Sequence, residues 1–154
     1  MRWTRMWRVL LGGGLVLLAA APCSVLAREE PTIAELKARL PGTSIQDRPP
    51  LCVRISERQL EAADRLYQAG DTEQAKAALT DVTAFAELAR DYSIQSHKHE
   101  KQAEIAMRKM TRKLGDLKHT VIREDQPAVQ DTIDRLERIR DDLLLAMFPK
   151  GGKK

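Results

Sequence analysis

The chain has 154 residues, with 26 Lys and Arg against 22 Asp and Glu, 4% aromatic residues and two cysteines. Three of the arginines, Arg2, Arg5 and Arg8, lie in residues 1–27, which contain no acids, so the remainder carries 23 basic (26 minus 3) and 22 acidic residues. This balance excludes a nucleic-acid-binding function that depends on net positive charge.

Residues 1–27 have the pattern of a secretory signal peptide. The arginines precede the apolar run VLLGGGLVLLAAA, and small side chains at Val25 and Ala27 fit cleavage after Ala27. That run, about 13 residues, is shorter than the roughly 20 that span a bilayer. Two alternatives stay open, namely an uncleaved membrane anchor and lipid attachment at Cys23, which Pro22 disfavours. We therefore expect a periplasmic or secreted bacterial protein that meets the membrane only through its signal peptide.

Cys52 is then the one cysteine that remains after cleavage. In an oxidising compartment a single cysteine is a buried thiol or forms an intermolecular disulfide. The apolar surroundings in LCVRI favour the buried thiol. A catalytic cysteine would need a base partner, and the spacing offers none.

Residues 28–55 predict a short helix followed by an extended tether. Thr32 and Glu35 have capping-box spacing at the head of TIAELKARL, and Pro41-Gly42 ends this helix. The chain from Pro41 to Ile55 contains three prolines and few periodic apolar residues, which favours an extended segment. Within it, LCVRI is expected to pack as a short strand-like piece.

Residues 56–148 are predicted to form a helical bundle domain, whose first helix begins at Ser56 and ends at Gly70. The stretch AADRLYQAGDTEQAKAAL, residues 62–79, resembles the middle of a tetratricopeptide unit, with Gly-Asp at the turn between two helices. Because the resemblance covers one unit, it implies a helical hairpin without the peptide groove that several stacked units form. The whole mature chain otherwise resembles the small secreted all-helical proteins of bacteria.

Residues 72–123 are predicted to form one long central helix, since they contain no proline and a single glycine, Gly115. Two interleaved columns of mostly apolar residues predict a seam with coiled-coil-like packing. An uninterrupted helix of this length would be about 75 Å long. The columns are Ala75, Val82, Ala89, Ser96, Ala103, Met110, Leu117 and Leu79, Ala86, Ser93, Glu100, Met107, Leu114, Val121.

The last helix is predicted to begin near Pro127, which a first turn tolerates, and to end before Pro149. Its apolar columns include Val129, Leu136 and Leu143. Because the connection at 124–127 is short, this helix must return antiparallel along the central one. Residues 149–154 are expected to be a disordered tail. The expected fold class is thus all-α, with antiparallel helical hairpins around one long central helix.

Charge patterning supports this antiparallel return. Residues 98–123 carry eight basic and three acidic residues, whereas residues 124–142 carry seven acidic and three basic residues. We expect these oppositely charged stretches to lie side by side, so that their charges determine which helix packs against which. A basic amphipathic helix that binds anionic lipid, within residues 107–118, is the competing interpretation.

The segment SIQSHKHEKQ, residues 93–102, is the one stretch whose composition suggests a functional site, with two histidines, a glutamate and two lysines. Neither neighbouring helix is expected to cover residues 90–101, which explains polar side chains there as a solvated helix face. A metal site is the alternative, because His97, Glu100 and Glu104 would share one face of a continuous helix. Lys101 lies within that arc and would repel a cation.

No nucleophile, acid pair or phosphate-binding loop occurs at useful spacing, so we expect a non-enzymatic protein without a cofactor. The leading hypothesis is a periplasmic or secreted interaction or scaffold protein, which binds a protein partner or self-associates along the central helix. The alternative is a periplasmic metal-binding or stress-chaperone-like protein that uses the face of His97, Glu100 and Glu104. An enzyme is a third and weaker interpretation.

Overall fold

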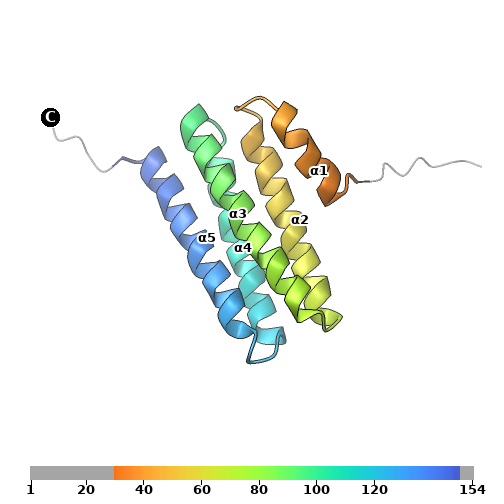
Figure 1. Ribbon diagram of the computed structural model, residues 1–154. Helices are drawn as coiled ribbons and strands as arrows, with labels where there is room; N and C mark the ends of the chain where they lie inside the picture. The colour runs from red at the N-terminus through yellow and green to blue at the C-terminus, as the bar shows by residue number, and fades with distance from the viewer. Residues whose placement is uncertain (1–29, 150–154) are drawn as a thin grey trace, which may run out of the picture. The chain divides into compact units, whose positions relative to one another are not determined.

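A computed structural model describes residues 30–149 of the chain. The predicted signal peptide with its cleavage site, Cys23, and the tail from residue 150 onward lie outside the described residues. The described part is all helical, as predicted (Figure 1). Its elements are α1 (Ile33–Arg39), the 3₁₀ helix η1 (Leu40–Gly42), α2 (Arg48–Gln68), α3 (Thr72–Ser96), α4 (Glu100–Thr120) and α5 (Gln126–Met147).

Helix α1 begins at the predicted capping box. The backbone N–H of Glu35 donates to Thr32 Oγ1 at 3.2 Å, and the backbone N–H of Thr32 donates to Glu35 Oε2 at 2.9 Å. Leu36 is buried, and Lys37 Nζ lies 2.6 Å from Asp81 Oδ2 of α3. The short helix is therefore held against the bundle by the buried Leu36 and by Lys37, which pairs with Asp81 and also lies over the ring of Phe85.

The extended tether predicted for residues 41–55 is wrong from Arg48 onward, where α2 begins. Pro49 and Pro50 occupy the first turn, in which a missing N–H costs nothing. Cys52 and Ile55 are fully buried and three residues apart, so the predicted strand-like piece is instead the apolar face of a helix. Ser56, at which a helix was predicted to begin, is instead a buried mid-helix residue, whose hydroxyl donates to the carbonyl of Val82 at 2.7 Å.

Helices α2 and α3 form an antiparallel hairpin at the predicted turn. Gly70 adopts φ 79°, a left-handed conformation that favours glycine. Asp71 then caps α3, because its side chain accepts from the backbone N–H of Gln74 at 3.3 Å. The hairpin is present as expected, although its kinship to tetratricopeptide units stays a prediction.

The single long helix predicted for residues 72–123 is wrong, because it breaks between Ser96 and Glu100. His97 (φ 51°) and His99 (φ 66°) both adopt left-handed backbone conformations, which histidine tolerates better than most residues. The break lets α4 fold back against the bundle, so that both halves of the predicted seam enter one core. A continuous rod would have left much of that apolar surface in water.

The centre predicted to be solvated is consequently at the end of the bundle and partly inside it. Ser93 is completely buried, and Glu104 is 7% exposed. Lys98, in contrast, is exposed in the turn, where its ammonium donates to Gln46 Oε1 at 2.6 Å. The polar residues of this segment therefore mark a turn between two helices.

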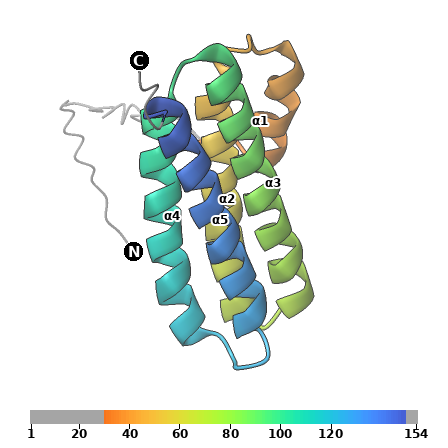
Figure 2. The same cartoon turned by 90° about the vertical axis from the view of Figure 1, so that its left-hand side faces the viewer.

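Two hairpins, α2–α3 and α4–α5, pack against each other to form a four-helix bundle (Figures 1 and 2). Helix α3 contacts α5, and α2 contacts α4, while the turn at 97–99 carries the chain across the diagonal from α3 to α4. Among the described residues α2 and α5 do not contact each other. The predicted antiparallel return of the last helix along its predecessor is confirmed for α5 and α4.

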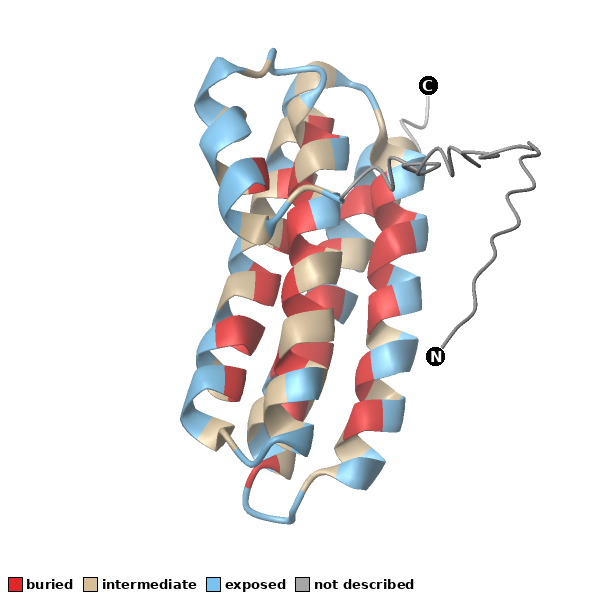
Figure 3. Cartoon of the chain, turned by 90° about the vertical axis from the view of Figure 1, so that its right-hand side faces the viewer, coloured by how far each residue is buried: buried red, intermediate tan, exposed pale blue. Residues whose placement is uncertain are grey.

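The core runs along the length of the bundle between the four helices (Figure 3). Most positions of the predicted seams are buried, including Val82, Met107, Met110, Leu114 and Leu136.

In the described part, no helix is long and apolar enough to cross a membrane.

Candidate functional site

The three residues of the predicted metal site do not converge on one point. His97 lies in the turn with its side chain 88% exposed, and its Nδ1 is 4.0 Å from Glu100 Oε1. Glu104 is buried and accepts a hydrogen bond from Arg140 Nε at 2.9 Å. Within residues 30–149 no group of three or more His, Cys, Asp or Glu side chains is placed to hold a metal ion. The break in the helix removes the shared face on which the prediction depended.

The ion pair between Arg140 and Glu104 joins α5 to α4 against the predicted charge pattern. The acid comes from the mostly basic helix and the base from the mostly acidic one. The hydrogen bond to Glu104, followed by the charges of Glu104 itself, Asp141 and Glu137, raises the pKa of Arg140. Asp141 and Glu137 thus stabilise the charged form of Arg140 in addition to its partner Glu104.

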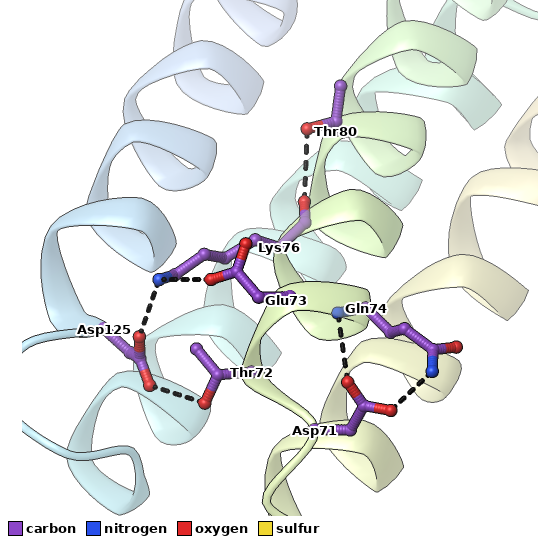
Figure 4. Close-up of polar contacts among 7 residues, drawn as sticks. All are labelled: Asp71, Thr72, Glu73, Gln74, Lys76, Thr80 and Asp125. Atoms are coloured by element: carbon purple, nitrogen blue, oxygen red, sulfur yellow. Dashed lines mark hydrogen bonds and ion pairs between the residues drawn. The ribbon is translucent and has the colours of Figure 1, made fainter.

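Asp125 is a buried carboxylate in the connection between α4 and α5, with a side chain 3% exposed. It accepts a hydrogen bond from Thr72 Oγ1 at 3.2 Å and pairs with Lys76 Nζ at 3.1 Å (Figure 4). The hydrogen bond to Asp125 is the main reason why the pKa of Lys76 is raised. No local pattern in the sequence indicated the partners of Asp125 on α3.

Cys52 is completely buried and has a free thiol, as the sequence predicted. Burial raises the pKa of this thiol to about 11, although the positive charge of Arg48 opposes the shift. The thiolate, which is the nucleophilic form, is therefore scarce at neutral pH. The geometry supports neither a catalytic nor a disulfide-forming role for Cys52.

A groove of about 500 Å³ lies between α2 and α4 near the α2–α3 turn, with Leu60 and Leu117 among its lining residues. Its acidic residues on α2 are already engaged. Glu61 pairs with Arg58 at 3.2 Å, and Asp64 accepts a hydrogen bond from Gln68 at 2.9 Å. The groove therefore offers no free acid pair on α2 for general acid and base chemistry.

The outward surface of α4 carries a basic stripe, formed by Lys101, Arg108 and Arg112, which are all exposed. Spacings of seven and four residues keep these cations on one helix face. Ile105, 43% exposed, lies in the same stripe. Among the described residues Lys101 and Arg112 form no ion pair, and Arg108 is 3.7 Å from Glu104 of its own helix. Two of the three cations in this stripe are thus free of ion pairs within the described residues.

An acidic stripe, formed by Asp134, Glu137 and Asp141, runs along the outward surface of α5. Spacings of three and four residues again place the side chains on one face. In the described structure Glu137 and Asp141 form no ion pair, while Asp134 accepts a hydrogen bond from Gln130. Leu145 and Phe148, 50% and 71% exposed, continue this stripe. The basic and acidic stripes together define the α4/α5 face, which the sequence did not reveal because it predicted that their charges would pair with each other.

No protein-family model, no curated protein and no solved structure matches this chain.

Proposed function

We propose that this protein is a non-enzymatic interaction or scaffold protein of the periplasm or extracellular space, which binds its partner through the α4/α5 face. The observation that carries the proposal is that a basic stripe lies beside an acidic stripe on this face, with exposed apolar side chains toward one end. Of the exposed large hydrophobic residues in the described part, Ile105, Leu145 and Phe148 lie on α4 and at the end of α5. Exposed apolar residues among unpaired charges are typical of a contact surface.

The rest of the described molecule supports a binding role in preference to chemistry. The buried thiol is protonated at neutral pH, the groove acids on α2 are engaged, and Asp125 is held by two partners. The location rests on the leader-like residues 1–27. Amino-terminal sequencing of the exported protein is expected to begin at Arg28.

The proposal is tested by affinity capture from the cell envelope, with the protein expressed with its own leader. Lys101→Glu/Arg112→Glu reverses two unpaired cations on the α4/α5 face, and we expect this variant to lose at least about tenfold of partner binding. Arg54→Glu/Arg65→Glu is the matched control, because these exposed arginines of α2 have the same spacing and lie away from that face.

A partner that is captured by the wild type and by the control, but not by the α4 variant, supports the proposal after binding is repeated with purified partner. Equal capture by both variants would reject the α4/α5 face. A finding of neither partner binding nor self-association in the wild type would reject the function.

A further inference from the structure

We infer that the α4/α5 face takes a second copy of this chain, in a two-fold dimer that sets α4 of each copy against α5 of the other. This inference rests on the proposed function and names its partner. Helices α4 and α5 lie side by side (Figure 2), which sets the basic stripe of one beside the acidic stripe of the other, so a copy of the same surface is its electrostatic complement. An anionic membrane or a nucleic acid would attract one stripe and repel the other.

The charges select one orientation of the two-fold axis. An axis parallel to the helices places α4 opposite α5 of the partner, with unlike charges in contact. An axis perpendicular to the helices, in the plane of the interface, places α4 opposite α4 and would bring like charges together. Only the parallel axis is compatible with the stripes.

The contacts within one copy fix the register of this dimer. Glu104 is level with Arg140, and Lys118 Nζ donates to Gln130 Oε1 at 2.6 Å, so these antiparallel helices are aligned along their length. With this alignment Arg108 lies at about the level of Glu137, one turn from the Glu104–Arg140 pair. A parallel two-fold axis preserves these levels, and therefore sets Arg108 opposite the partner's Glu137.

The same alignment sets Arg112 at about the level of Asp134. Two charge pairs, each repeated by the symmetry, then lie along the middle of the interface. The exposed Ile105, Leu145 and Phe148 lie toward the end of the bundle where α4 begins and α5 ends. Their burial against the second copy supplies the apolar part of the contact.

The area of the face predicts a weak dimer. Two adjacent helices of about 20 residues give a face of roughly 30 by 20 Å, or about 600 Å² per copy. The total of about 1,200 Å² is at the lower end of specific interfaces, for which we expect a dissociation constant in the micromolar range. The stripes are exposed to solvent in each free copy, where salt screens the attraction between them, so added salt should weaken the dimer.

Sedimentation velocity over a range of protein concentrations and salt tests the inference. We expect wild-type protein to dimerise, and we expect Arg108→Glu/Arg112→Glu and Asp134→Arg/Glu137→Arg each to raise the dissociation constant by about tenfold or more. When the two variants are mixed, both sets of contacts again join unlike charges, so the mixture should dimerise. Arg54→Glu/Arg65→Glu is the control with a matched charge change, and circular dichroism checks that each variant is folded.

A wild type that remains monomeric at every concentration overturns the inference, as does a dimer that neither variant weakens or that the mixture fails to restore. Binding of monomers to phosphatidylglycerol vesicles, lost in Arg108→Glu/Arg112→Glu, would instead assign the basic stripe to a membrane. The proposed function survives a monomeric result if envelope capture finds a protein that requires the α4/α5 face. The two failures are therefore distinguishable.

Discussion

His97 holds its backbone in the left-handed region directly after α3, at φ 51° and ψ 35°. A residue with a Cβ in this conformation is strained by about 1–2 kcal/mol, whereas glycine is not. Its side chain is 88% exposed, so replacing it removes little packing. The turn between the two hairpins therefore contains a strained position that can be relieved.

We expect His97→Gly to raise the free energy of unfolding by about 0.5–1 kcal/mol, because relief of strain exceeds the added flexibility of the unfolded chain. His97→Val should lower it by about 1 kcal/mol, since a branched side chain is disfavoured at positive φ. Urea denaturation measures both changes. If the two variants shift stability in the same direction, the turn does not have the described conformation.

The buried thiol of Cys52 makes stability depend on alkaline pH. Its pKa is about 11 in the folded protein against 9.0 for an ordinary thiol, so between these values the unfolded state binds fewer protons. The contribution of the protonated thiol to the free energy of unfolding should therefore be fully present below pH 9. It should fall by about 2–3 kcal/mol as the pH rises to 11. Cys52→Ala removes this contribution, and the difference in pH dependence between it and the wild type, measured by denaturation, isolates the thiol. Parallel profiles would contradict the assignment.

At the scale of the elements, Asp125 connects the loop before α5 to the first turns of α3. Thr72 and Lys76 both bind its buried carboxylate. This contact links the turn ends of the two hairpins, which also share the ion pairs Arg90–Asp142 and Lys109–Glu57. A buried acceptor with two partners is a larger contribution to stability than an exposed ion pair.

We expect Asp125→Ala to lower the free energy of unfolding by about 1–3 kcal/mol, because Thr72 and Lys76 lose their acceptor. Asp131→Ala, in the adjoining helix α5, is the matched control, since Asp131 is exposed and among the described residues pairs with Arg135 of its own helix alone. That change should cost about 0.5 kcal/mol or less. Thermal denaturation compares the two, and equal losses would show that the buried contact adds nothing.

An element could be predicted where the residues that determine it are close together in the sequence. The capping box of α1 and the turn at Gly70 depend on residues next to each other in sequence, and both were predicted correctly. The start of α2 was missed because Pro49 and Pro50 were taken as evidence against a helix, although a first turn accepts them. The spacing of three or four residues between Cys52, Ile55, Gln59 and Ala63, all of them buried, was the signal that could have revealed the start of this helix.

For the whole molecule, the decisive feature is the break at residues 97–99. The same apolar columns are expected for one continuous helix and for two helices that pack into one core. The apolar pattern alone therefore cannot distinguish a rod from a bundle. The strongest sequence evidence was the loss of apolar residues at Ser93, Ser96 and Glu100, which was interpreted as solvation of a continuous helix. The α4/α5 face could not be predicted either, because it depends on which charges remain unpaired after folding.

A distance between two spin labels tests the folded-back arrangement. Glu73→Cys and Lys118→Cys, in a Cys52→Ala background, mark the start of α3 and the end of α4. In the bundle the start of α3 and the end of α4 lie at the same end (Figure 1). Because these two helices are diagonal, neighbouring helix axes 8–10 Å apart predict a backbone separation of roughly 15 Å. A continuous helix would separate them by about 68 Å. Pulsed electron resonance distinguishes these values, and the longer one would refute the bundle.

The exposed Lys98 lies between two self-contained antiparallel hairpins. A single tryptic cut after Lys98 would leave each hairpin covalently intact. The two fragments would still have complementary apolar surfaces. Such fragments should reassemble spontaneously, with an affinity that reports how strongly one half of the molecule holds the other. A nicked protein that stays intact in solution would turn this three-residue turn into a site where the chain can be opened and rejoined by design.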